Sequence, residues 1–97
     1  MRTRTEVIVI NEKDNVGTTL EALSAGAEIS VKVRGHTEKI RLLSDIPKGH
    51  KLALTDIEKG EAVIKYGEQI GQSTSRISRG EYVHVHNVVS QVRSERS

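Results

Sequence analysis

Apolar residues in this chain fall into short segments separated by polar turns, most of which carry a glycine. Between Ile29 and Val33 every second residue is apolar. This period of two is typical of a strand with one buried face. Gly35-His36 follows as a predicted hairpin turn, and Ile40 and Leu42 mark the returning strand. The segment therefore predicts an antiparallel hairpin.

The first apolar segment is continuous. The run from Val7 to Ile10 predicts a strand buried on both faces, which ends at a cluster of turn-forming residues at 11–15. The next segment, from Thr18 to Leu23, fits either a short strand or a single helical turn.

A pattern of one apolar residue, two variable residues, a glycine, two variable residues and a second apolar residue recurs along the chain. We expect each glycine to take a positive φ at the end of a tight turn, because glycine adopts that conformation without steric cost. The first apolar residue would enter the core, and the second would begin a strand. Asp45 and Asp56 precede two copies, where a carboxylate can accept hydrogen bonds from nearby backbone amides, and Pro47 lies inside one turn. The copies are Leu23/Gly26/Ile29, Ile46/Gly49/Leu52, Ile57/Gly60/Val63 and Ile77/Gly80/Val83.

The composition strengthens the prediction of strands. The apolar side chains are mainly Val and Ile, and the 97 residues include no Phe and no Trp. Side chains branched at Cβ fit a pleated surface better than a helix. The sequence therefore predicts a single all-β domain of short strands and glycine turns. Residues 1–6 are expected to be disordered, and residues 90–97 to form a flexible tail or the start of a linker.

Charge and cysteine usage argue against several classes of function. The net charge is only +2, and the sole aromatic residues are Tyr66 and Tyr82. A nucleic-acid-binding domain usually concentrates Lys and Arg beside stacking aromatics. There is no cysteine for disulfides, and the longest apolar run is too short to span a membrane. We expect a soluble cytoplasmic protein that binds neither nucleic acid nor membranes.

Two histidines near the end of the chain are the sharpest chemical feature. His84 and His86 alternate with Val83 and Val85. On a strand the valines would face the core, and the histidines would share the other face with Tyr82. Two imidazoles placed in this way can reach one divalent metal ion, but the spacing also fits a solvated strand face. No third ligand stands beside them, so a metal site would need groups from elsewhere.

Two further segments carry candidate chemistry. In Gly49-His50-Lys51 an imidazole and an ammonium group follow a turn, where His50 can act as acid, base or ligand and Lys51 can attract an anion. In Lys65-Tyr66-Gly67 the glycine permits close approach of a ligand or a second chain. An exposed turn and a bent strand are the alternative interpretations. His36, at the predicted hairpin tip, is expected to be a surface residue.

Five segments, in this order, resemble the small SAF-type domain of the altronate/galactarate dehydratase family. The resemblance extends from about Val7 to Val88. The segments are Asp14-Asn15-Val16, Asp45 to Leu54, Asp56 to Glu61, Ile64 to Glu68 with Ile70-Gly71, and His84-Val85-His86-Asn87.

This resemblance implies a fold, a partner and a reaction. The fold would be a SAF domain over residues 7–89, a β-clip of short, folded-over strands. In the family this domain either precedes a much larger catalytic region or forms a separate small subunit; whether it also self-associates as a homo-oligomer is left open. The enzymes are hydro-lyases that remove water from sugar acids such as altronate. They depend on Fe²⁺ or Mn²⁺, which we expect to be bound mainly by the large subunit.

The resemblance also implies roles for individual residues. His50, His84 and His86 are expected to be catalytic, and His84 and His86 are candidate metal ligands as well. We expect the isolated chain to be inactive, because its site would be completed by the large partner. The predicted substrate-binding residues are Lys51, Lys65, Tyr66 and Asn87.

Two other functions stay open. A related branch of the family cleaves sulfite from sulfolactate, and this chain could be the small alpha subunit of such an enzyme. A SAF module can also be a non-catalytic structural or binding domain. In that case the three candidate catalytic histidines would tolerate replacement by Ala.

Overall fold

Strands and turns make up the part of the chain that the structure describes. This computed structural model describes residues 7–33 and 35–90, and these ranges contain no helix, so none that could cross a membrane. All strand pairs are antiparallel, in sheets with the orders β1-β2-β5-β8, β3-β4 and β6-β7-β9. The all-β prediction is confirmed. The strands are β1 (Val7–Ile8), β2 (Val16–Thr19), β3 (Glu28–Val33), β4 (His36–Arg41), β5 (Lys51–Ala53), β6 (Ala62–Lys65), β7 (Glu68–Ser73), β8 (Tyr82–Val83) and β9 (Val88–Ser90).

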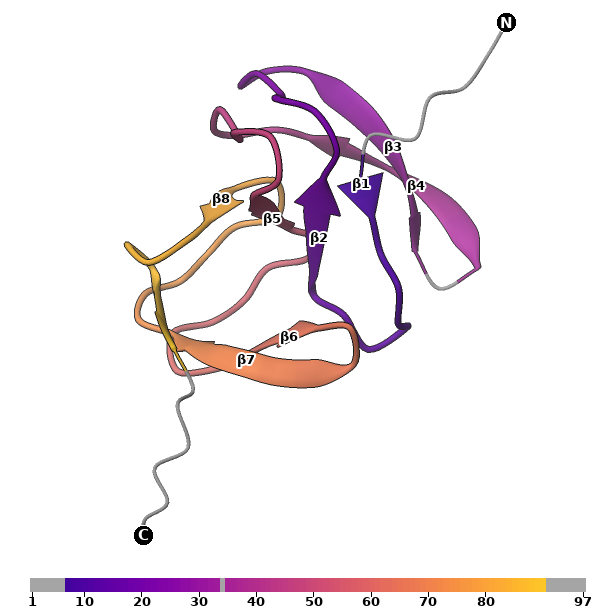
Figure 1. Cartoon of the computed structure of the whole chain (residues 1–97). Helices are drawn as coiled ribbons and strands as arrows, with labels where there is room; N and C mark the ends of the chain where they lie inside the picture. The colour runs from indigo at the N-terminus through magenta and orange to yellow at the C-terminus, as the bar shows by residue number, and fades with distance from the viewer. Residues whose placement is uncertain (1–6, 34, 91–97) are drawn as a thin grey trace, which may run out of the picture.

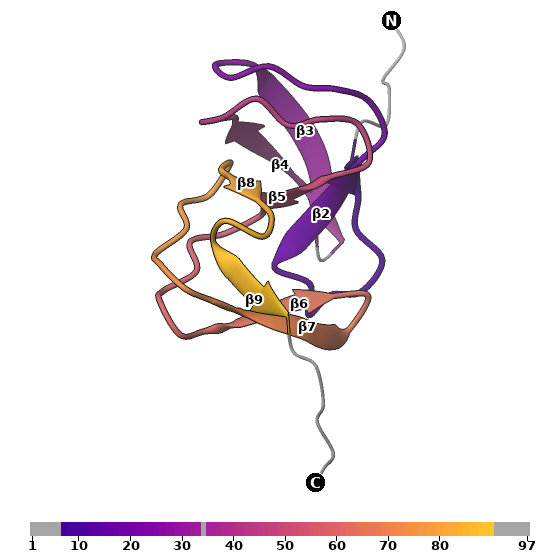
Figure 2. The same ribbon diagram turned by 60° about the vertical axis from the view of Figure 1, so that its left-hand side comes forward.

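The four-stranded sheet lies between the two smaller sheets. Figures 1 and 2 show the β3–β4 hairpin at one end of the molecule and β6, β7 and β9 at the other. Directly paired residues project from the same face of a sheet. Leu52 and Tyr82 are paired and pack with the hairpin side, whereas Lys51 and Val83 are paired and face the three-stranded sheet. The two faces of this sheet therefore serve different cores.

Both cores consist of small aliphatic side chains, as the lack of Phe and Trp requires. Burying them supplies the main favourable term in folding. The core toward the hairpin contains Val7, Ile29, Val31, Val33, Ile40, Leu42, Ile46, Leu52 and Leu54. The core toward β6 and β7 contains Val16, Ala53, Ile57, Val63, Ile77 and Val83.

The glycine pattern found in the sequence forms two interlocked pairs of turns. Leu23 and Ile46 exchange two backbone hydrogen bonds of 2.8–2.9 Å, and Ile57 and Ile77 exchange two of 2.8 Å. The four glycines have φ values of +82° to +89°, as predicted. In each pair, the glycine amide of one turn also donates a hydrogen bond to a carbonyl that precedes the other turn. That carbonyl lies four residues before the other turn's first apolar residue, as in the bond from the Gly26 amide to the Leu42 carbonyl. The same backbone arrangement is thus built twice, with approximate two-fold symmetry within each pair.

The two aspartates ahead of the turns hold each pair together. Asp45 Oδ1 accepts a hydrogen bond of 2.9 Å from the Ala25 amide, and Asp56 Oδ1 accepts one of 2.9 Å from the Arg79 amide. The sequence predicted that these carboxylates would bond to nearby amides. The amides instead belong to the paired turns, 20 and 23 residues away.

The prediction for the first segment is partly wrong. The strand ends at Ile8, and Ile10 is 66% exposed rather than buried. The buried carboxylate of Asp14 accepts hydrogen bonds from the Ile10 and Asn11 amides, which turns the chain away from the sheet. For the next segment the strand alternative is correct only for Thr18 and Thr19, because β2 ends there; residues 20–22 are irregular, and no helical turn follows.

The predicted hairpin is confirmed. Ile29 pairs with Ile40, and Val33 pairs with His36 beside Gly35, whose φ is +82°. The expectations for residues 1–6 and 90–97 fall outside the described residues, except for Ser90, which ends β9.

Candidate functional site

The pairing of β5 with β8 brings two distant segments of candidate chemistry together. Lys51 lies opposite Val83 and Leu52 opposite Tyr82, so His50 lies diagonally across from Tyr82 on the same face. The Tyr82 hydroxyl lies 2.7 Å from Nδ1 of His50, a hydrogen-bond distance. The direction of this bond depends on the tautomer of the neutral ring: with the proton on Nε2, Nδ1 accepts from the hydroxyl, and with the proton on Nδ1 the ring donates to the phenol oxygen. In the first tautomer the proton on Nε2 is the one left for another partner.

Four aromatic rings gather around this bond. The His84 ring is stacked on Tyr82 at a centroid distance of 5.5 Å and lies 4.8 Å from the His50 ring. The His86 ring lies 5.4 Å from Tyr82 on a tilted plane. The three predicted catalytic histidines therefore form one cluster with Tyr82 at its centre. We call this the ring cluster: His50, Tyr82, His84 and His86.

The backbone that carries the last two histidines differs from the prediction. The strand ends at Val83, and a turn covers residues 84–87. Val83 is fully buried as predicted, but Val85 is 80% exposed and does not face the core. The prediction for Val85 is wrong because the chain leaves the pleated conformation one residue earlier.

Asn87 holds this turn closed. Its Oδ1 accepts a hydrogen bond of 3.0 Å from the His84 amide, and its Nδ2 donates one of 2.9 Å to the Tyr82 carbonyl. The Asn87 amide also donates to the His84 carbonyl. Asn87 is buried, so its side chain positions His84 from within the fold.

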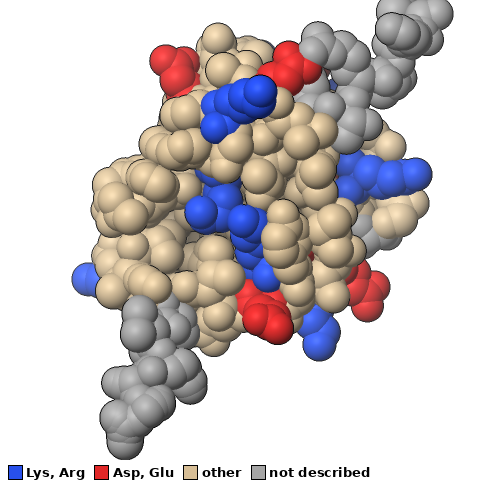
Figure 3. Space-filling model, in the orientation of Figure 1, with Lys and Arg blue, Asp and Glu red and all other residues tan. Residues whose placement is uncertain are grey.

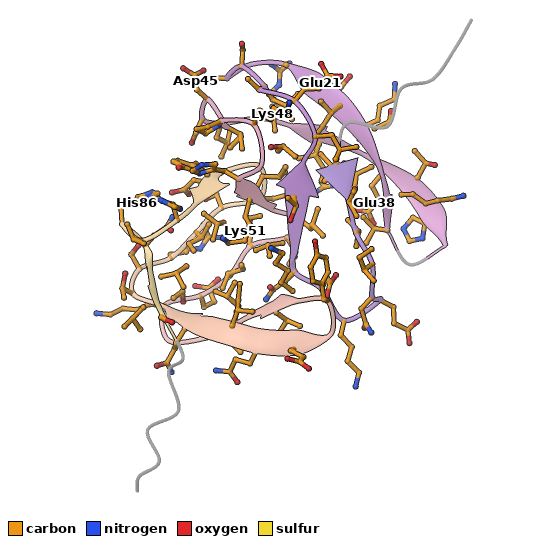
Figure 4. All side chains as sticks on the ribbon, viewed as in Figure 1. Glu21, Glu38, Asp45, Lys48, Lys51 and His86 are labelled. Carbon is orange, nitrogen blue, oxygen red and sulfur yellow. The ribbon has the colours of Figure 1, made fainter. Side chains whose placement is uncertain are left out.

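A small pocket opens beside the ring cluster on the face of the sheet that carries Lys51. Its volume is about 200 Å³, and its walls are Lys51, Ile70, His84, Val85, Val88 and Ser90. In Figure 3, Lys and Arg atoms gather at the centre of this face, where Figure 4 labels Lys51. His86 lies nearer the edge of the same view (Figure 4). The pocket therefore combines one ammonium group, one imidazole and apolar walls.

Positive charge dominates the electrostatics of this pocket. Burial lowers the pKa of Lys51, and the nearby ammonium group of Lys65 lowers it further. The pKa of His84 is also lowered, first by burial and then by the positive charges of His50, Lys51 and His86. A site with these neighbours favours a negatively charged ligand and a neutral His84.

Two predicted substrate-binding residues lie on the β6–β7 hairpin. Lys65 ends β6, and its ammonium group lies 4.8 Å from the ring centroid of Tyr66. Tyr66 has a φ of +56° and is followed by Gly67 at +80°, a two-residue turn that Asp14 holds by accepting a 2.7 Å hydrogen bond from the Gly67 amide. Figure 1 shows this turn on the side of the molecule away from β8. The structure thus connects Lys65 with Lys51, but it does not bring Tyr66 to the ring cluster.

His36 behaves as the sequence predicted. It is exposed on the β3–β4 hairpin, and its Nε2 lies 2.8 Å from Oε2 of Glu38. It is therefore a useful reference histidine outside the site.

The donor set at the ring cluster does not fit a metal ion held by this chain. No group of three or more His, Cys, Asp or Glu side chains within residues 7–33 and 35–90 is placed to hold one. Nδ1 of His50 is engaged by Tyr82, and Lys51 places a positive charge in the pocket that His84 lines. Two imidazoles beside an ammonium group are a poor cation site.

Tyr82 is the site residue that sequence reasoning missed. The pattern placed it on the face of His84 and His86 without giving it a role. One available signal was its rarity, since only two aromatic residues occur in 97. Its hydrogen-bond partner lies 32 residues away, so the role itself required the β5–β8 pairing.

Comparison with known proteins identifies what the chain resembles over most of its length. The family model described as the altronate/galactarate dehydratase SAF domain matches residues 5–91. The chain is 44% identical to altronate dehydratase from Escherichia coli over 82 residues, which cover 84% of this chain and 16% of that protein. It is 36% identical to the Bacillus subtilis altronate dehydratase over 80 residues, which cover 82% of this chain and 15% of that protein. The chain thus spans about a sixth of these two relatives.

A second kind of relative is close to this chain in size. The (2R)-sulfolactate sulfo-lyase subunit alpha from Chromohalobacter salexigens is 38% identical over 86 residues. The match covers 86% of this chain and 92% of that subunit.

Proposed function

The chain belongs to the altronate/galactarate dehydratase SAF domain family, and on that basis we propose that it contributes residues to the active site of a sugar-acid hydro-lyase. In this proposal it is the small subunit or the N-terminal domain of the enzyme. A large catalytic subunit or domain completes the site, and the isolated chain is inactive. The assembled enzyme would act in the cytoplasm on a substrate such as altronate.

One observation carries this proposal: the β5–β8 pair gathers three imidazoles, a phenol and an ammonium group beside one small pocket. Ligand pockets for small organic molecules usually enclose about 300–1,000 Å³. The pocket here has about 200 Å³ and is open, so it supports binding of one end of a substrate. The remaining enclosure would come from the partner.

The chemistry of dehydration assigns a task to each charged group. Loss of water from a sugar acid removes the proton next to the carboxylate and expels the neighbouring hydroxyl group. Lys51, assisted by Lys65, would bind the carboxylate and stabilise the negative charge that develops on it. His84, whose pKa is lowered by burial and then by its positive neighbours, would be neutral and suited to accept a proton. With the Tyr82 hydroxyl donating to Nδ1, His50 would present its proton on Nε2 to the departing oxygen.

The other predicted residues receive supporting roles. His86 extends the ring cluster next to Tyr82, toward the partner. Asn87 would act on the substrate through the turn that positions His84. Tyr66 stays a predicted substrate contact, one that a long substrate could reach through Lys65. We assign the divalent ion, Fe²⁺ or Mn²⁺, to the large partner, where it would supply electrophilic assistance.

Activity of the assembled enzyme tests the proposal. The chain would be produced together with its large partner, and the loss of water from altronate would be followed. Replacing both His84 and His86 by Ala should abolish turnover, whereas His36→Ala, at the exposed reference histidine, should leave it unchanged. Full activity of the double variant would contradict the proposal and would favour a structural module.

A sulfolactate sulfo-lyase alpha subunit is the second candidate, because the match to such a subunit covers 92% of its length. A sulfonate is also an anion that Lys51 could bind. Release of sulfite from sulfolactate by the same assembly, without dehydration of altronate, would select this alternative.

A further inference from the structure

Among residues 7–33 and 35–90, no acidic side chain lines the pocket beside the ring cluster. Lys51 and His84 line it, and Lys65 lies close enough for its charge to act on Lys51. Within residues 7–33 and 35–90, the carboxylates of Glu38, Asp56 and Glu58 form ion pairs with His36, Arg76 and Arg79 instead. None of these ion pairs reaches the pocket. The positive groups there are therefore available to a ligand.

The surroundings of these groups strengthen their attraction for an anion. The other walls of the pocket are the apolar side chains of Ile70, Val85 and Val88, together with Ser90. Apolar walls reduce dielectric screening, so an ammonium group among them interacts more strongly with an anion than it would in open water. The compact volume of about 200 Å³ suits a head group such as carboxylate or sulfonate.

The same arrangement opposes a metal ion at His84 and His86. Both rings rest against Tyr82, and no third suitable ligand is placed with them in the described residues. A divalent cation bound to His84 would also face the ammonium group of Lys51 across the pocket. Binding there would bring like charges together, and no carboxylate of the described residues lines the pocket to compensate.

We propose that this chain alone forms a receptor for the carboxylate group of a small polyhydroxy acid at Lys51 and His84, and that His84 and His86 are not metal ligands. The choice of a polyhydroxy acid rests on the function proposed above. The charge preference rests only on the pocket. The metal-binding and anion-binding tasks of the enzyme would thus be divided between the large and the small partner.

Histidine side-chain NMR spectra of the full chain without its partner test the anion receptor. Sodium gluconate is the probe, and sorbitol is the matched control because it has the same carbon skeleton and no charge. Gluconate should shift the His84 signals saturably, and sorbitol should not. Lys51→Met should weaken gluconate binding at least about tenfold, as expected for loss of a charged hydrogen-bond donor. Lys39→Met, on the exposed surface of β4, should have no effect.

A second titration, with Mn²⁺, tests the exclusion of metal. Paramagnetic broadening at His84 and His86 should not exceed that at His36, which is exposed beside Glu38. Saturable Mn²⁺ broadening confined to His84 and His86 would overturn the inference. Absence of a gluconate shift in the wild type, or equal binding by Lys51→Met, would overturn it too. Each of these results can occur whether or not the assembled enzyme dehydrates altronate, so failure of the receptor is distinguishable from failure of the proposed function.

Discussion

Tyr82 and His50 are joined across the β5–β8 pair by a 2.7 Å hydrogen bond between the phenol hydroxyl and Nδ1 of the imidazole. In the tautomer proposed for catalysis the hydroxyl donates to Nδ1, and the proton of His50 lies on Nε2. The bond also anchors the ring on which His84 is stacked. A side chain that does not itself line the pocket therefore orients two that we propose to be catalytic.

Replacing Tyr82 by Phe should keep the rings in place while removing this bond. We expect turnover of the assembled enzyme to fall at least about tenfold, because a general acid in the wrong tautomer loses much of its contribution. The free energy of unfolding should fall by only about 1 kcal/mol. The ¹⁵N shifts of the His50 ring report the tautomer directly, and they should change in Tyr82→Phe.

The other tyrosine provides the control for this measurement. Tyr66 is exposed on the β6–β7 turn, and Tyr66→Phe should leave the His50 ring signals as they are. Unaltered His50 signals in Tyr82→Phe would show that the hydroxyl does not set the tautomer.

Asn87 should be the most costly polar residue of the site to remove. Asn87→Ala leaves the His84 amide and the Tyr82 carbonyl without their partner in a partly buried setting. Each unsatisfied buried group carries a penalty, so we expect a loss of about 2–3 kcal/mol in the free energy of unfolding. Urea denaturation of the full chain measures it.

Asn11 is a matched control for that change. Its Oδ1 accepts a hydrogen bond from the Lys13 amide in an exposed turn, so Asn11→Ala should cost only about 0.5 kcal/mol. Equal losses in the two variants would contradict the view that Asn87 holds the His84 turn.

The features that could be predicted from the sequence are local ones. Alternation from Ile29 to Val33 and the glycine at Gly35 together encode a hairpin whose partners are neighbours along the chain. Likewise each glycine turn depends on the φ of a single residue, such as +88° at Gly60. Such signals need no knowledge of distant contacts.

The pairing of the turns could not be predicted. Four similar units can be combined in more than one way, and the sequence gives no preference for Leu23 with Ile46 or for Ile57 with Ile77. The pairing follows from how both cores close around the central sheet. The hydrogen bonds of Asp45 and Asp56 to the paired turns share this non-local origin.

The sequence indicated which residues could form the candidate site, but not how they are arranged. His84 and His86 do share a face with Tyr82, yet they do so from a turn and not from a strand. The alternation of the histidines with Val85 predicted a strand, but a hydrogen bond from the His84 amide to the Asn87 side chain stabilises a turn there. The proximity of Lys51 to His84 depends on register between β5 and β8, which no local pattern specifies.

The lowered pKa of His84 makes stability depend on pH in a defined window. Its causes are burial first, and then the charges of His50, Lys51 and His86. The unfolded chain binds a proton at this residue near its ordinary pKa of 6.5, whereas the folded chain binds it only at lower pH. The free energy of unfolding should therefore decline as the pH falls from about 7 toward about 5, and this part of the decline should disappear in His84→Gln.

Carboxylates make the free energy of unfolding depend on pH in a second window, at lower pH. The pKa of Glu38 is lowered by its hydrogen bond with His36, and the pKa of Asp56 by its bond from the Arg79 amide. Their contributions are present above their ordinary pKa values and are lost as the pH falls below about 4.5. Urea midpoints from pH 8 to pH 4 separate the two windows. Coincidence of the His84→Gln and wild-type profiles above pH 5 would rule out the proposed origin of the decline.

Gly80 and Gly60 occupy the same position in two paired turns but differ in what surrounds them. Both have a positive φ, +89° and +88°, so Ala at either position is strained by about 1 kcal/mol. A Cβ at Gly60 would meet open space, whereas a Cβ at Gly80 would clash with the Arg41 carbonyl oxygen at the end of β4. Backbone cannot move aside as a flexible side chain does, so we expect Gly80→Ala to cost about 3 kcal/mol in total. Gly60→Ala should show only the conformational part. Urea denaturation of both variants gives the difference, and equal losses would mean that the hairpin sheet does not pack against the second turn pair as closely as the structure indicates.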